Sequence, residues 1–128
     1  MNYCVHILVC HNKVLLLKRS KKNNFFPSIW TPIIGKVKDD EDPKNAVLRE
    51  TIEETSLKIK DDISFFCVEQ YKEDKYWFYF SIWDPIYPVI VLNHENEKYD
   101  FFKMNELPDN LWRLFQKKIN LLMDYLTQ

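Results

Sequence analysis

The chain begins with two short apolar runs, at residues 3–10 and 13–18, with the polar pair His11-Asn12 between them. Runs rich in valine, isoleucine and leucine favour strands, and two such runs joined by two polar residues are typical of a β-hairpin. The sequence therefore predicts a hairpin at the start of the chain, followed by a polar, basic loop over residues 20–24.

Further β-prone segments follow at intervals. Residues 28–34 contain Trp30 and three isoleucines around Pro32. Because proline cannot donate a ladder hydrogen bond, this segment predicts a short strand broken at an edge or a bulge. Residues 63–70 and 75–83 predict two strands with a polar turn between them, and shorter strands are expected at 89–92 and 99–102.

Two segments have helical character. Asp42 followed by Pro43 is a helix start, with aspartate as the N-cap, and predicts a helix over residues 43–55. We expect Ala46, Val47, Leu48 and Ile52 on its core side and its glutamates on the opposite side. Residues 109–126 predict an amphipathic helix, with Leu111, Leu114, Phe115, Leu122 and Leu126 at helical spacing. Strands with one inserted and one terminal helix predict an α/β fold, a mixed sheet flanked by helices.

The first helix has an unusual acidic pattern. Glu50, Glu53 and Glu54 are spaced i, i+3, i+4, which places three carboxylates a turn apart on one face. Adjacent like charges destabilise a helix unless positive charge lies among them, and Arg49 lies one turn before Glu53. Mg²⁺ is typically held by a few carboxylates together with substrate phosphates. The pattern predicts a metal site, and its alternative is a solvated acidic helix face.

A family can be named from residues 35–57. This run resembles the Nudix box, G-x5-E-x7-R-E-U-x-E-E-x-G-U, where U is a bulky apolar residue; the matching residues are Gly35, Glu41, Arg49, Glu50, Glu53, Glu54 and Leu57. Thr51 departs from the box where an aliphatic residue is usual, and Ser56 departs where a second glycine is usual. The resemblance implies one Nudix hydrolase domain over residues 1–128, with the α/β/α sandwich of that family.

Glycine is present at one position of the box and absent from another, and both positions are informative. Gly35 is the only glycine of the chain, so backbone freedom or close approach is needed at that position. Ser56 falls where the helix should end in a left-handed residue, at a cost on the order of 1 kcal/mol relative to glycine. This cost concerns stability and loop shape, not metal binding.

A second, weaker resemblance lies in residues 93–102, Asn-His-Glu-Asn-Glu-Lys-Tyr-Asp-Phe-Phe. It is similar to the segment His-Glu-His-x-x-Tyr-x-Trp found in Nudix triphosphate pyrophosphohydrolases and diadenosine tetraphosphate hydrolases. There the loop glutamate supplies another metal carboxylate or acts as base. Glu95 is the aligned residue, and Glu97 is the alternative if the alignment slips by two.

The resemblance implies a site and a cofactor. Mg²⁺, with Mn²⁺ as a substitute, would be held by the Gly35 carbonyl and by Glu50, Glu53, Glu54 and Glu95. Arg49 would orient the glutamates, and Glu53 or Glu95 would take a proton from the attacking water. The sequence leaves the identity of this base and the number of ions open.

Candidate substrate contacts come from the cationic and aromatic residues around the box. Lys18, Arg19, Lys21 and Lys22 form the main cationic cluster, and Arg19 is its best phosphate candidate, with Lys36 beside Gly35 comparable. Trp30 is a candidate for stacking on a base. Phe25 and Phe26 are more often core residues.

The expected function is Mg²⁺-dependent hydrolysis of a nucleoside triphosphate or related compound to a monophosphate and pyrophosphate. Alternatives are a dinucleoside polyphosphate hydrolase and a Nudix-fold protein that binds nucleotide without turnover. The net charge of −1 argues against binding a nucleic-acid polymer. No apolar run approaches the roughly 20 residues that span a bilayer. The oligomeric state stays open.

The cysteines are few. Cys4, Cys10 and Cys67 form an odd set, expected to be reduced thiols, and with no signal peptide apparent this favours the cytoplasm. Cys10, His11 and His6 suggest zinc, but a second ligand pair at zinc spacing is missing from the sequence. We therefore expect no zinc site.

Overall fold

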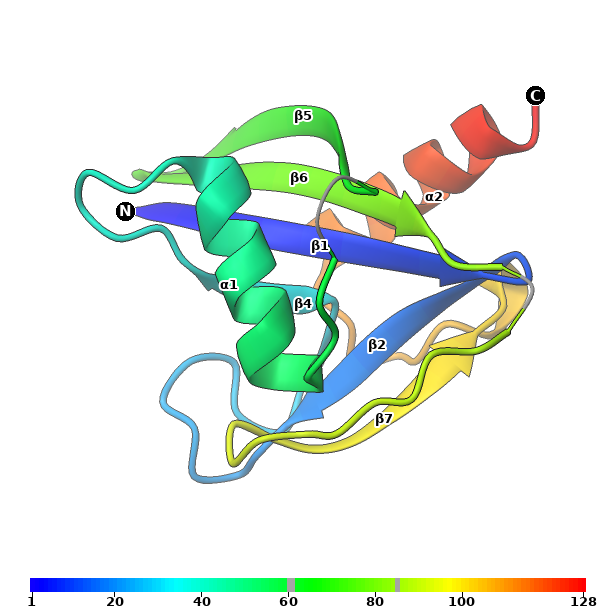
Figure 1. The fold of residues 1–128 in the computed structure, drawn as a ribbon, viewed down its shortest axis with the longest axis horizontal. Coiled ribbons are helices and arrows are strands. Elements are labelled where there is room, and N and C mark those ends of the chain that lie inside the picture. The colour runs from blue at the N-terminus through cyan, green and yellow to red at the C-terminus, as the bar shows by residue number, and fades with distance from the viewer. Residues whose placement is uncertain (60–61, 85) are drawn as a thin grey trace.

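The computed structural model describes residues 1–59, 62–84 and 86–128. A mixed sheet lies between two helices, α1 (Pro43–Thr55) on one face and α2 (Arg113–Leu126) on the other (Figure 1). The expected α/β/α sandwich is confirmed. Among the described residues, no helix is long and apolar enough to cross a bilayer.

The sheet has a main path of five strands, and two further strands pair with members of that path. Its main strand order is β3-β2-β1-β6-β5, while β4 pairs with β1 and β7 pairs with β2. Only the β1–β6 pairing is parallel among the pairings between described strands. The strands are β1 (Asn2–Cys10), β2 (Lys13–Arg19), β3 (Trp30–Thr31), β4 (Ile33–Lys36), β5 (Ser64–Tyr71), β6 (Asp74–Ile82) and β7 (Asn96–Phe102), with a 3-10 turn at Met104–Glu106.

The central strand β1 is buried on both faces. Tyr3, Val5, Ile7 and Val9 contribute to the core under α2, together with Phe115 and Leu122 of that helix. Cys4 and Leu8 contribute to the core under α1 with Ala46 and Val47. This explains why residues 3–10 form a continuous apolar run, since alternate side chains enter two different cores.

The predicted hairpin is confirmed, with a tight left-handed turn. His11 and Asn12 have φ of 52° and 59°, and the strands pair only at Val9–Val14 and Cys10–Lys13. Beyond these pairs β1 and β2 separate, and the segment after the basic loop fills the gap: β3 pairs with β2, and β4 pairs with β1. Pro32 lies at this change of partner, so the predicted break is also confirmed.

Three expected elements differ in the structure. Residues 89–92 form no strand; instead the Val91 N–H donates to the Thr55 carbonyl at 3.0 Å, which fixes this segment to the end of α1. Helix α2 begins at Arg113, not at 109, because the preceding Leu111 forms a bridge with Trp30. Strand β7 begins at Asn96, three residues before the expected start.

Candidate active site

Helix α1 has the predicted limits, and its end residues explain them. The Asp42 carboxylate accepts a hydrogen bond from the Lys44 N–H at 2.8 Å, and Pro43 follows as the first helical residue. At the other end Ser56 is left-handed, with φ of 65°, and its N–H donates to the Ile52 carbonyl. Ser56 therefore takes the conformation that the second glycine of the box would take.

The orientation of α1 differs from the expectation. Glu50 and Glu54 face the sheet and are buried, whereas Ile52 is 43% exposed and Leu48 is half-buried. The buried residues of α1 lie at positions 46, 50 and 54 and at positions 47, 51 and 55, two series in which successive residues are four apart. The prediction that Ile52 faces the core and the glutamates face away was wrong, because it assumed that carboxylates avoid burial. Glu53 alone of the three has an exposed side chain.

Gly35 in β4 leaves the space that the Glu50 side chain occupies. A Cβ atom at Gly35 would lie 2.0 Å from the Glu50 Cδ, so any other residue here would force the Glu50 side chain to shift. Gly35 is not among the residues with positive φ, so close approach, not a special backbone angle, requires glycine here. The Gly35 carbonyl accepts a hydrogen bond from the Cys4 thiol at 3.6 Å.

Glu50, Glu54 and Glu95 form a group that we term the carboxylate cluster. Their side-chain oxygens lie within 4.8 Å of one another, although Glu95 comes from the loop before β7. Glu54 is fully buried, and its Oε1 accepts from Asn96 Nδ2 at 3.1 Å and from Arg19 at 3.4 Å. Its Oε2 is buried without a hydrogen-bond partner among the described residues.

Burial and crowding make this cluster electrostatically costly. Burial raises the pKa of Glu54 well above its usual range, and the nearby Glu50 carboxylate raises it further. Burial also raises the pKa of Glu50. A buried oxygen without a donor costs about 1–3 kcal/mol. A divalent cation among three hard oxygen donors would remove both costs, so these residues fit a bound Mg²⁺.

Arg49 connects the helix to the loop that precedes it. Its Nε and Nη2 donate to the two oxygens of Glu41 at 2.9 and 3.0 Å, a bidentate pair. The hydrogen bonds from Arg49 hold the pKa of Glu41 at about 2. Its Nη1 donates to Glu50 at 2.8 Å and lies 3.4 Å from Glu53. The expected pairing with Glu53 is thus present, but the contacts to Glu41 and Glu50 are shorter.

Arg19 lies on the other side of the cluster. It is 2% exposed, and its guanidinium lies 3.4 Å from Glu54 and 3.6 Å from Glu95. Its charge is therefore directed at carboxylates of the cluster. Two residues that sequence reasoning did not select complete this side: Asn96 bonds Glu54, and Asn23 donates to the Glu95 carbonyl at 3.3 Å.

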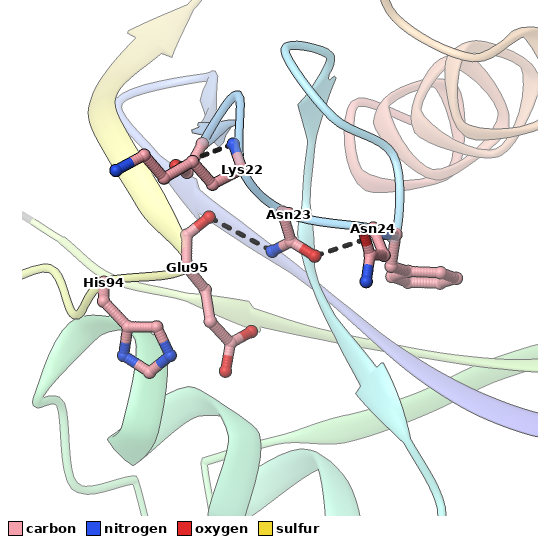
Figure 2. A pocket seen from close by; sticks show the side chains of 7 residues that line it. Lys22, Asn23, Asn24, His94 and Glu95 are labelled. Carbon is pink, nitrogen blue, oxygen red and sulfur yellow. Dashed lines mark hydrogen bonds between the residues drawn. The ribbon is translucent and has the colours of Figure 1, made fainter.

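Beside the cluster lies a cavity of ≈ 380 Å³. Figure 2 shows the Glu95 side chain and the His94 ring extending toward α1, while Asn23 is held against the Glu95 backbone. A smaller hollow of ≈ 250 Å³ is lined by Gly35, Lys36 and Glu50, and it shares other lining residues with this cavity. The larger cavity is lined by Ser20, Lys22, Asn23, Asn24, Phe25, His94 and Glu95.

A model of the NUDIX domain matches residues 2–124. The chain belongs to the NUDIX family. Within this family, the curated relatives include the m7GpppN-mRNA hydrolase NUDT17 of Xenopus laevis, 33% identical over 81 residues, which are 63% of this chain and 23% of that protein. NUDT17 of Danio rerio is 40% identical over 52 residues, 41% of this chain and 17% of that protein. The matched regions thus span under a quarter of these relatives.

Solved NUDIX structures share the fold. A MutT NUDIX hydrolase from Burkholderia pseudomallei superposes with a TM-score of 0.77 at 22% identity, covering 93% of this chain and 95% of that one. A C. elegans Ap4A hydrolase has a TM-score of 0.74 at 20% identity and covers 98% of both chains. The NUDIX domain of Shewanella oneidensis NrtR, solved with ADP ribose, has a TM-score of 0.80 at 17% identity, covering 98% and 88%.

The other candidate residues of this NUDIX chain lie around the cluster. Glu53 contacts Arg49 and is not part of the carboxylate cluster. Glu97 pairs with Lys18 at 3.8 Å, so the structure brings Glu95, not Glu97, to the other carboxylates. The Lys36 side chain is exposed, and its carbonyl accepts from Arg49. Trp30 packs its ring against Phe102 at 5.0 Å.

Proposed function

We propose that the chain is a Mg²⁺-dependent hydrolase of compounds that contain a nucleoside diphosphate linked to another group. The first candidate reaction converts a (deoxy)nucleoside triphosphate and water to a nucleoside monophosphate and pyrophosphate. Water attacks phosphorus, the phosphoanhydride bond breaks, and the pyrophosphate oxygen leaves. The observation that carries the proposal is the buried carboxylate cluster beside an open cavity, with an unpartnered Glu54 Oε2 among the described atoms.

The metal ligands proposed are Glu50, Glu54, Glu95 and the Gly35 carbonyl, with Glu53 as a further carboxylate reachable from solvent. Mn²⁺ would be a substitute, since it also prefers oxygen donors. When bound, the ion neutralises charge on phosphate oxygens and lowers the pKa of a bound water.

The chain itself would position these groups and move the proton. Arg49 and Glu41 hold Glu50 in place, while Arg19 and Asn96 hold Glu54. The proton of the attacking water would pass to Glu53 or Glu95, whose side chains are 45% and 30% exposed. Partial exposure leaves either carboxylate accessible to water, which a general base requires.

Substrate contacts would come from the cavity wall. Lys22 and His94 can donate to phosphate oxygens, and Lys36 can do so from the adjoining hollow. Phe25 stacks on Tyr3 at 5.1 Å, so its ring is held in place at the cavity edge. Arg19 would act on phosphate only indirectly, through the carboxylates that it pairs with. Trp30 stays a stacking candidate, although its ring packs on Phe102 and lies under Lys98.

A second candidate substrate is a dinucleoside polyphosphate. The curated relatives are named as hydrolases of m7GpppN mRNA and a solved structure with the same fold is an Ap4A hydrolase. Both substrates join two nucleosides through a polyphosphate. The net charge of −1 offers little attraction for a long RNA, which favours a small cap-like dinucleotide over an RNA chain. Binding without turnover is the third candidate, and the retention of every box glutamate argues against it.

The test is product identification by chromatography after incubation with Mg²⁺. The substrates would be the nucleoside triphosphates, their deoxy forms, diadenosine tetraphosphate, a cap dinucleotide, a capped RNA and ADP-ribose. Monophosphate with pyrophosphate supports the first candidate. Cleavage confined to dinucleotides selects the second, and tight binding with no product selects the third. A cytoplasmic setting is part of the proposal, because an odd and sparse set of three cysteines suits reduced thiols.

A further inference from the structure

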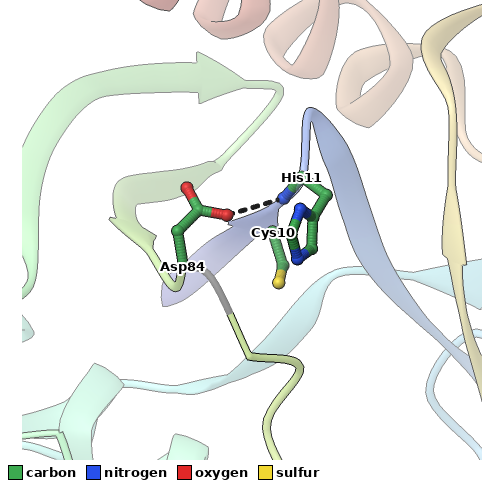
Figure 3. A group of neighbouring side chains, drawn as sticks. All are labelled: Cys10, His11 and Asp84. Atoms are coloured by element: carbon green, nitrogen blue, oxygen red, sulfur yellow. Dashed lines mark hydrogen bonds between the residues drawn. The ribbon is translucent and has the colours of Figure 1, made fainter.

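A second group of potential metal ligands lies at the opposite end of β1 from Gly35. The turn between β1 and β2 brings together the Cys10 thiol, the His11 ring and the Asp84 carboxylate (Figure 3), with one ligand atom of each within 4.8 Å of the others. Gly35 pairs with Cys4, six residues before Cys10 on the same strand, so this group is separate from the carboxylate cluster. We propose that Cys10, His11 and Asp84 form a site for Zn²⁺.

The backbone explains how neighbouring residues contribute to one site. Successive side chains of an extended strand point to opposite faces, which would separate Cys10 from His11. His11 instead has φ of 52° and Asn12 has φ of 59°, so the chain turns at His11 and its ring lies beside the Cys10 sulfur. Histidine is one of the few non-glycine residues that is enriched in this conformation.

Asp84 is brought to the turn by the sheet. Strand β6 runs parallel to β1, with Val9 opposite Ile82, and the Trp83 N–H donates to the Val9 carbonyl at 2.7 Å. The Asp84 Oδ1 then accepts the His11 N–H at 2.9 Å, across 73 residues of chain. Because the third ligand comes from so distant a position, its contribution could not be read from the spacing of cysteine and histidine in the sequence.

The donor set selects the kind of ion. One sulfur, one ring nitrogen and one carboxylate oxygen suit Zn²⁺, whereas Mg²⁺ prefers oxygen alone. Tetrahedral Zn²⁺ bonds of about 2.0–2.3 Å place ligand atoms roughly 3.3–3.8 Å apart, so each pair of ligand atoms would have to approach by at most about 1.5 Å. Three protein ligands leave the fourth position for water.

Burial and charge are consistent with entry of the ion from solvent. The Cys10 side chain is buried, while His11 and Asp84 are exposed above it. Burial and the Asp84 carboxylate raise the pKa of the Cys10 thiol, and Lys13 opposes this. A cation displaces the thiol proton, so binding should release a proton and strengthen as the pH rises. Such an ion would fix the β1–β2 turn to the segment after β6, whether or not the chain hydrolyses nucleotides.

The test is a titration of the full chain with Co²⁺ and then Zn²⁺, in excess Mg²⁺ that occupies the carboxylate cluster. We expect about one equivalent of Co²⁺ with a thiolate-to-cobalt charge-transfer band, which Zn²⁺ then removes by displacement. Cys10→Ser should abolish the band. His11→Asn, which suits the left-handed turn, and Asp84→Asn, which keeps the acceptor for the His11 N–H, should each weaken Zn²⁺ binding about tenfold or more.

Two matched variants exclude other origins. Cys67→Ser removes the half-buried thiol of β5, and Glu54→Gln disables the carboxylate cluster; both should keep the band and the affinity. Loss of the band in either variant would overturn the proposal. So would unchanged Zn²⁺ affinity in both His11→Asn and Asp84→Asn, or the absence of any thiolate band in the unmodified chain. Circular dichroism of each variant checks that it is folded.

Discussion

Thr51, one of the two departures from the Nudix box, belongs to a buried polar network. His6 is fully buried, with its Nδ1 2.9 Å from the Thr51 hydroxyl and its Nε2 2.7 Å from the Ser81 hydroxyl. The Thr51 hydroxyl donates its one hydrogen to the Val47 carbonyl at 2.7 Å, so it must accept from His6. His6 therefore carries its proton on Nδ1 and accepts from Ser81 at Nε2. The polar Thr51 of the box therefore has a hydrogen-bond partner in the sheet, the His6 ring.

This network predicts an effect of Thr51→Val. Valine keeps the shape of threonine but leaves the His6 Nδ1–H without an acceptor, which should lower the free energy of unfolding by about 1–3 kcal/mol. Urea denaturation measures the change. The pair Thr51→Val with His6→Leu should cost less than the sum of the two single changes. Additive costs would show that the two side chains do not interact.

The same histidine predicts a pH dependence. Burial lowers the pKa of His6 to about 3, whereas the unfolded chain protonates histidine near its ordinary value of 6.5. The stabilising contribution of neutral His6 is complete above about pH 6.5 and is lost as the pH falls toward 3, by at most about 1.4 kcal/mol per pH unit. As the pH is lowered from about 7 to about 5, the free energy of unfolding should fall less in the His6→Gln variant than in the unmodified chain. Equal losses, measured by denaturant midpoints, would contradict the burial of a neutral ring.

Among the elements, α1 and β4 are in close contact at Glu50 and Gly35. The Glu50 side chain occupies the space beside Gly35, and a Cβ atom at that position would displace it. Gly35→Ala should push Glu50 away from the cluster and lower both Mg²⁺ affinity and the rate of hydrolysis, the rate about a hundredfold or more. Lys44→Ala, on the exposed face of the same helix, is the control and should change neither. Unchanged Mg²⁺ binding in Gly35→Ala would mean that Glu50 is not a ligand.

The elements also show what a sequence can and cannot specify. The limits of α1 were predictable because Asp42, Pro43 and Ser56 act locally, through capping and backbone conformation. The buried side of α1 was not, because burial of Glu50 and Glu54 depends on Gly35 in another element and on Arg19, which is distant in sequence. A residue pattern alone assigns carboxylates to solvent. Likewise the apolar run at residues 89–92 predicts a strand, yet Val89 and Val91 are exposed and the segment is hydrogen-bonded to the end of α1.

At the scale of the whole molecule, the carboxylate cluster joins parts of the chain that are far apart. Glu50 and Glu54 come from α1, and Glu95 comes from the loop before β7. An ion that binds all three should bind the folded chain and not the unfolded one. We therefore expect millimolar Mg²⁺ or Mn²⁺ to raise the melting temperature. Scanning calorimetry with and without metal measures this, and Glu54→Gln should remove most of the increase. An equal increase in the variant would place the ion elsewhere.

The role of the carboxylate cluster is tested most directly by the Mg²⁺-dependent rate of monophosphate release. The rate is measured with a nucleotide that the unmodified chain hydrolyses, for that chain and for Glu54→Gln. Glutamine keeps the size of Glu54 and can still accept from Arg19, but it loses the charge and one oxygen acceptor that the ion requires. We expect a fall on the order of a thousandfold, ~4 kcal/mol of transition-state stabilisation, with the fold retained. A variant that hydrolyses the same nucleotide at the full rate would contradict the assignment of the carboxylate cluster as the catalytic metal site.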